Sequence, residues 1–162
     1  MTTKAAFTTD EWKTLMQAPF VVGMYITMAS PSLTDAIKES MAVAKEIAKT
    51  AESASGSELL TALVDEYKDA ATAKMAQPDF NTRDIEAIKT EALADVKSAA
   101  AVLKSKATPA EATEITKWIY DIGVAAAEAA KEGDFLGIGG VRVSDDEKAA
   151  LAQLASALGV SV

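Results

Sequence analysis

Residues 108–131, TPAEATEITKWIYDIGVAAAEAAK, decide the fold class. Thr108 stands where an N-cap is expected, Pro109 takes the first helical position and Glu111 the third, so a helix begins here. Apolar side chains then recur every three or four residues, which places them on one helix face. They are Ile115, Trp118, Ile119, Ile122, Ala126 and Ala129. The stretch predicts a helix that runs to about Lys131.

The same helical spacing extends over the rest of the chain. Further helices are expected from Thr8 or Thr9 to the turn at Ser30-Pro31, and over about residues 32–50, 57–75, 82–104 and 144–158. The last of these opens with a capping box, Ser144 to Glu147, and closes at Gly159. Pro19 is expected to kink the first helix or to restart it.

These helices predict an all-α protein, because no run alternates with period two long enough to form a sheet. We expect an antiparallel helical bundle that forms a single domain over residues 1–162. Its four-helix core would come from about five helices plus the short C-terminal helix. The apolar stripes predicted for the first four helices are Trp12, Leu15, Met16, Phe20, Gly23, Met24 and Thr27; Ile37, Met41, Ala44, Ile47 and Ala48; Leu59, Leu60, Leu63, Val64 and Tyr67; and Ile85, Ile88, Ala92, Val96, Ala99 and Leu103.

Composition excludes several classes of function. The chain has 162 residues and a net charge of −8, with its 16 basic residues scattered among acids, so nucleic acid and anionic membrane surfaces are not expected partners. The longest apolar run, Leu15 to Ala29, is broken by Gln17, Pro19 and Gly23 and is too short to span a membrane. The first residues lack the layout of a signal peptide, and we expect a soluble cytoplasmic protein.

The absence of histidine and cysteine narrows the chemistry further. It excludes Ser-His-Asp and Cys-His catalysis and the ordinary zinc and di-iron sites. Carboxylates alone could still hold a hard cation, and Glu39, Glu46 and Glu128 lie close enough to apolar stripes to be considered. We predict no metal and no cofactor, and an enzyme would have to use carboxylates, lysine, tyrosine or Arg142.

A glycine loop follows the helix at 108–131 and contains four of the eight glycines. Its candidate binding residues are Phe135, Gly137, Gly139, Gly140 and Arg142. The spacing resembles a dinucleotide-binding pattern, but the required strand does not precede it. Two interpretations stay open: the loop plugs the end of the bundle, or it is a contact surface. Arg142 would pair with Glu132, Glu39 or Asp146 in the first case, and with a partner's carboxylate or a phosphate in the second.

A second candidate site is a pocket between the helices. The small residues, the methionines and the proline of the first helix could leave space there for a small ligand. Its candidate residues are Trp12, Met16, Phe20, Met24 and Trp118. The same side chains also suit a core, in which each indole N–H needs an acceptor.

The segment from Val124 to Ser144, which contains AAKEGDFLGIGGVRVS, is similar to the C-terminal signature of a family of small uncharacterised bacterial all-helical proteins. Glu147 and Leu151 after it, and Glu11-Trp12 and Ala18-Pro19 near the start, also resemble that family. The resemblance implies no established activity and no catalytic residue. It does imply that the glycine loop and Ala18-Pro19 are family features.

Two functions from different classes follow from these observations. The first is a non-enzymatic module that works through protein contact, with a protein partner or with itself as a homodimer. The second is a binder of a small apolar or amphipathic ligand between the helices. A cavity of a few hundred Å3 beside the first helix would favour the second.

Overall fold

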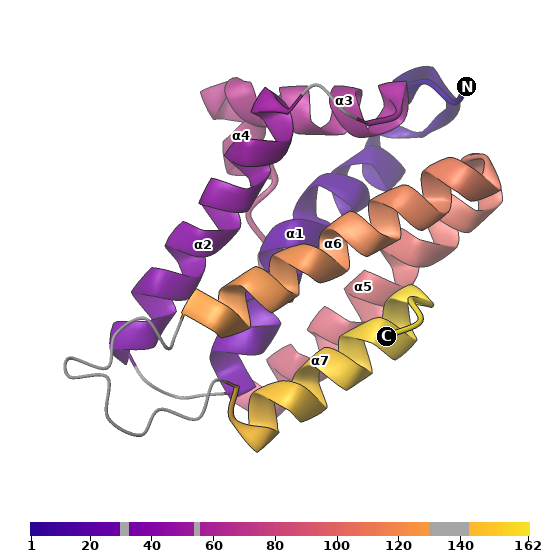
Figure 1. The fold of residues 1–162 in the computed structure, drawn as a ribbon. Coiled ribbons are helices and arrows are strands. Elements are labelled where there is room, and N and C mark those ends of the chain that lie inside the picture. The colour runs from indigo at the N-terminus through magenta and orange to yellow at the C-terminus, as the bar shows by residue number, and fades with distance from the viewer. Residues whose placement is uncertain (30–32, 54–55, 130–142) are drawn as a thin grey trace.

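A computed structural model describes residues 1–29, 33–53, 56–129 and 143–162, with the backbone alone for 33–37. These residues form an all-α bundle in which no strand occurs, as the sequence predicts (Figure 1). The elements are η1 (Lys4–Ala6), α1 (Thr9–Ala29), α2 (Leu33–Glu52), α3 (Glu58–Asp65), η2 (Glu66–Lys68), α4 (Ala70–Met75), α5 (Ile85–Lys106), α6 (Pro109–Ala129) and α7 (Asp145–Leu158), where η marks a short 3-10 helix. Among these helices, none has both the length and the apolar content needed to cross a membrane.

Helix α1 is the centre of the bundle, because it packs against α2, α5, α6 and α7. Leu15, Val22 and Ile26 are fully buried, and the predicted apolar face therefore extends around most of the helix. Two glycines allow the close packing. A Cβ at Gly23 would lie 2.5 Å from Val43 Cγ2 of α2, and a Cβ at Gly123 of α6 would lie 2.7 Å from Val22 Cγ1.

The C-terminal helix α7 belongs to the core, since it packs on α1, α5 and α6. Its predicted capping box is confirmed: the Ser144 side chain accepts from the Glu147 backbone N–H, and the Glu147 side chain accepts from the Ser144 backbone. Gly159 ends the helix with φ of 69°, the left-handed conformation that favours glycine.

One predicted helix is wrong in its extent, and one of the two alternatives for Pro19, a restart of the helix, is excluded. Helix α1 continues through Pro19 and does not restart there. The helix expected over 57–75 is interrupted, because α3 ends at Asp65 and α4 begins only after Asp69. The Asp69 side chain accepts from the Thr72 backbone N–H at 2.9 Å, and this local bond replaces the helical one.

The predicted apolar stripe of α2 is wrong in part, because Ile47 is buried as predicted but three other members are not, and the side chain of Ile37 lies outside the described ones. Met41 is 68% exposed, and Ala44 and Ala48 are exposed as well, while Val43 and Ile47 are buried. Alanine occurs on both the buried and the exposed faces of helices, so Ala44 and Ala48 did not indicate which face packs on the core. The side chain of Val43 is the one that packs against Gly23 of α1. At the start of α5, Ile85 is 57% exposed because it is the first residue of its helix.

Candidate functional site

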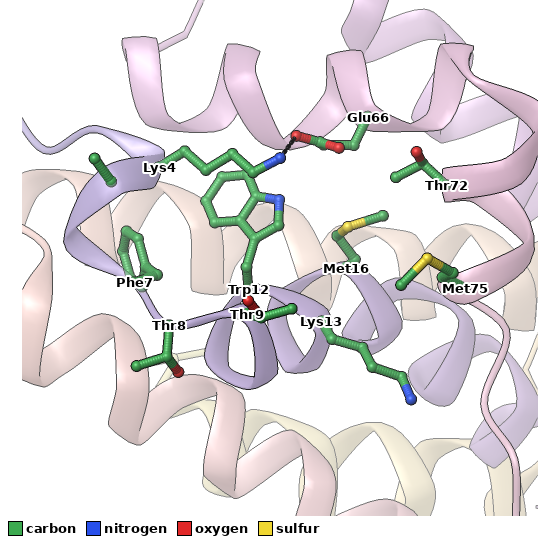
Figure 2. Close-up of a pocket in the computed structure, with 11 residues that line it drawn as sticks. Lys4, Phe7, Thr8, Thr9, Trp12, Lys13, Met16, Glu66, Thr72 and Met75 are labelled. Atoms are coloured by element: carbon green, nitrogen blue, oxygen red, sulfur yellow. Dashed lines mark hydrogen bonds and ion pairs between the residues drawn. The ribbon is translucent and has the colours of Figure 1, made fainter.

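A hollow of about 460 Å3 lies where η1, the first turns of α1, η2 and α4 meet. Phe7, Trp12, Met16 and Met75 form its apolar walls, as Figure 2 shows. Lys4, Lys13 and Glu66 bring charges to it, and Thr8, Thr9 and Thr72 bring hydroxyl groups. These residues come from four elements, so the hollow is a product of tertiary packing. We call it the Trp12 hollow.

The first residues of the chain form one wall of the Trp12 hollow because Glu111 holds them in place. The Glu111 carboxylate accepts from the Thr2 backbone N–H at 2.9 Å and from Thr2 Oγ1 at 2.7 Å. It also accepts from the Thr108 backbone and hydroxyl, at 2.9 and 2.7 Å, as the predicted capping box requires. These four bonds, with the Thr2 backbone N–H as the largest cause, lower the pKa of Glu111 to about 2.

A second anchor fixes the turn into α1. Thr8 and Glu11 form a capping box, with Thr8 N donating to Glu11 Oε2 at 2.7 Å and Glu11 N donating to Thr8 Oγ1 at 3.2 Å. Lys106 of α5 donates to the Ala6 carbonyl at 3.0 Å and to Glu11 Oε2 at 2.7 Å. The Lys106 ammonium is the largest cause that lowers the pKa of Glu11. The wall is therefore tied to both α5 and α6.

Trp12 is the central side chain of the hollow and is 5% exposed. Its ring packs against Phe7 at 5.6 Å between centroids, and Lys4 Nζ lies 5.4 Å from the ring centroid. The indole nitrogen, Nε1, is buried and has no hydrogen-bond acceptor among the described residues. Figure 2 shows this nitrogen directed toward the space between Glu66, Thr72 and Met16.

Lys4 and Glu66 form an ion pair across the hollow, beside the indole ring (Figure 2). The Glu66 side chain is 19% exposed and the Lys4 side chain 55% exposed, so the pair lies at the mouth. Lys13 lines the hollow from α1 and makes no ion pair within the described part of the chain. Figure 2 shows the Lys13 ammonium directed away from Trp12, so the Lys4–Glu66 pair brings the charges nearest to the indole ring.

The five residues predicted for a pocket do not share one site. Trp12 and Met16 line the Trp12 hollow together, as their spacing of four residues on one helix allows. Phe20 and Met24 line a different hollow of about 390 Å3, beside Gly23 and Val43. Trp118 lies on α6 and donates its indole N–H to Thr50 Oγ1 at 2.9 Å.

A groove between α2 and η2 is as large as the Trp12 hollow, but the tyrosine hydroxyl in its lining already has a hydrogen-bond partner. It measures about 460 Å3 and is lined mainly by Phe20, Ile47, Val64, Tyr67 and alanines. The Tyr67 hydroxyl already donates to the Met16 carbonyl at 2.7 Å. The hydroxyl of Tyr67 in this groove is therefore already paired, unlike the indole N–H of Trp12.

The other predicted binding residues, Phe135, Gly137, Gly139, Gly140 and Arg142, lie outside the described residues. Of the carboxylates expected to pair with Arg142, Glu39 is fully buried and Asp146 is exposed. Glu46 pairs with Lys49 at 3.2 Å, and Glu128 is exposed. Within the described ranges, no three acidic side chains lie close enough together to hold a metal ion.

The sequence did not predict that Lys4, Phe7, Glu66 and Met75 belong to this site, because they reach Trp12 only after η1, η2 and α4 have packed on α1. The one signal for the site in the sequence was that each buried indole N–H requires an acceptor.

The chain was compared with protein-family models, with curated proteins and with solved structures. None of the three comparisons gave a match.

Proposed function

We propose that this protein binds a small molecule with an apolar body and a hydrogen-bond acceptor in the Trp12 hollow. One observation carries the proposal: a buried indole N–H without an acceptor lies at a hollow of about 460 Å3. Leaving such a donor unpaired destabilises a protein by about 1–3 kcal/mol. An acceptor on a ligand would recover that energy.

The shape and lining of the hollow support the same function. Its volume falls within the range of small-molecule sites, roughly 300–1,000 Å3. Phe7, Met16 and Met75 offer apolar contact, and thioether side chains adapt to ligands of irregular shape. Met75 is 55% exposed, so apolar surface is available at the mouth.

The walls of the hollow are held in place by contacts within the protein. Glu111 and Lys106 attach residues 2–6 to α6 and α5 by hydrogen bonds that leave the Trp12 ring untouched. A site that is formed in advance loses less entropy when a ligand binds.

Protein contact through the glycine loop stays a second prediction from the sequence, and no observation in the described residues favours it. The two proposals rest on different residues of the chain and are tested separately.

Native mass spectrometry of the protein purified from its own cells tests the proposal. We expect a bound molecule of defined mass, which Trp12→Phe loses because the variant keeps an aromatic ring but removes the donor. Trp118→Phe is the matched control and should retain the molecule. A ligand-free mass for the unaltered protein, or equal retention in both variants, would contradict the proposal. The same spectrum reports whether the chain forms a homodimer.

A further inference from the structure

We propose that the ligand of the Trp12 hollow is an amphipathic carboxylate. Its carboxylate group would take the place of Glu66 in the ion pair with Lys4 and would accept a hydrogen bond from the indole N–H of Trp12. This inference rests on the proposed function and adds the chemical class of the ligand. The juxtaposition that carries it is an unpaired buried donor, Trp12 Nε1, beside a lysine that already binds a carboxylate.

The first step of the argument concerns the donor. An indole N–H can only donate, so the ligand atom next to it must be an acceptor. A carboxylate oxygen is a stronger acceptor than a neutral one, because hydrogen bonds to ionised groups are roughly twice as strong. A cationic head group offers no acceptor, and Lys4 already lies 5.4 Å from the centroid of the Trp12 ring, where such a cation would bind.

The second step concerns Glu66, whose carboxylate shows that the hollow accepts this group. Its Oε1 is bound to Lys4 Nζ, and the pair spans the mouth beside Trp12 (Figure 2). Neither Glu66 oxygen is placed to accept from Trp12 Nε1. A ligand carboxylate has two oxygens and could contact Lys4 with one and Trp12 with the other.

The third step concerns the energy of the exchange. Ion pairs that are open to solvent contribute little, about 0–1 kcal/mol, so releasing Glu66 from the half-exposed Lys4 is a small loss. A ligand carboxylate restores the contact with Lys4 and adds the buried indole bond.

Isothermal titration with three probes of equal chain length separates the charge classes: octanoate, octan-1-ol and octyltrimethylammonium. We expect octanoate to bind most tightly and the ammonium probe to bind most weakly. Lys4→Met should weaken the binding of octanoate severalfold, up to about fivefold, because a carboxylate contact with a half-exposed lysine contributes about 0–1 kcal/mol. The binding of octan-1-ol should stay unchanged. Lys117→Met, in an exposed pair with Asp121 on α6, is the matched control and should change neither.

Glu66→Gln gives a second and opposite readout. It removes the internal competitor for Lys4, so octanoate should bind severalfold more tightly. The Glu66→Gln variant tests the inference even if Lys4→Met does not fold. If the Lys4–Glu66 pair only stabilised the structure, Glu66→Gln would lower the affinity for all three probes.

The outcomes distinguish the two proposals. If octan-1-ol binds as tightly as octanoate, or if Glu66→Gln weakens octanoate, the carboxylate inference is wrong and the ligand-binding function stands. Tightest binding of the ammonium probe would contradict both proposals, because this probe has no acceptor for the Trp12 N–H. If none of the three probes binds, both proposals are wrong.

Discussion

Trp118 Nε1 donates to Thr50 Oγ1 at 2.9 Å and so joins α6 to α2. Thr50 in turn donates to the Glu46 carbonyl at 2.9 Å, so its hydroxyl both gives and receives a hydrogen bond. Trp12, the other tryptophan of the chain, is equally buried but has no such acceptor. Trp118 therefore makes a structural contact, whereas Trp12 is the tryptophan whose N–H we propose a ligand would pair.

Thr50→Val should destabilise the protein by about 1–3 kcal/mol, because it leaves the buried Trp118 N–H unpaired. Thr50→Ser keeps the hydroxyl and should lose much less. Urea denaturation followed by circular dichroism measures both. Equal losses for the two variants would show that the methyl group of Thr50, and not its hydroxyl, matters.

Gly23→Ala should destabilise the bundle by about 1–3 kcal/mol, because the new Cβ would lie 2.5 Å from Val43 Cγ2. In an ordinary helix interior the same change is stabilising, so the sign tests the packing of α1 on α2. Val43→Ala in the same chain removes the clash and should recover part of the loss. A melting temperature that rises for Gly23→Ala alone would contradict the close approach of the two helices.

Acid should weaken the attachment of the first residues to α6. The pKa of Glu111 is lowered from 4.5 to about 2 in the folded protein, so its carboxylate stabilises the fold fully above pH 4.5. This contribution is lost as the pH falls from about 4.5 toward 2. Urea denaturation between pH 6 and pH 2.5 should show a steeper loss for the unaltered protein than for Glu111→Gln.

Glu58→Gln on α3 is the control for this pH series, because Glu58 is exposed and takes no part in the hydrogen bonds described above for residues 2–6. Its pH dependence should match that of the unaltered protein. Identical pH slopes for Glu111→Gln and the unaltered protein would mean that Glu111 does not bind Thr2 in solution.

If the glycine loop plugs the bundle, Arg142 should stabilise the fold by pairing with Glu132, Glu39 or Asp146. Glu132 lies outside the described residues, and of the other two we test Glu39 first because it is buried and Asp146 is exposed. A double-mutant cycle of Arg142→Ala and Glu39→Gln should give a coupling energy of about 0.5–3 kcal/mol, the range for residues in contact. The cycle of Arg142→Ala with Asp146→Asn should give almost none. Arg142→Ala with unchanged melting would favour a partner or a phosphate as the contact of Arg142.

The helix starts were the most predictable part of the fold. Thr8 with Glu11, Thr108 with Glu111, and Ser144 with Glu147 all form the capping boxes that their spacing indicates. The two residues of such a cap lie three positions apart, so their spacing in the sequence is enough to predict the contact. Asp69 was missed because it caps a helix of six residues inside a run that is helical by composition.

The candidate site was predicted only in part. Trp12 and Met16 lie one turn apart on the same helix, which the sequence reveals. Lys4 and Glu66 are 62 positions apart, and no local pattern predicts that they meet. Phe20, Met24 and Trp118 are residue types that often line pockets, but here they do not reach the Trp12 hollow. Phe20 and Met24 line a different hollow, and Trp118 contacts Thr50 of α2.

The most direct test of the ligand-binding account is a 1H–15N correlation spectrum of the two indole N–H groups, with and without octanoate. Trp12→Phe and Trp118→Phe assign the two signals. The account predicts that the Trp12 signal shifts and that its exchange with water slows, while the Trp118 signal stays in place. A Trp12 signal that does not respond to octanoate, or that moves no more than the Trp118 signal, would contradict it.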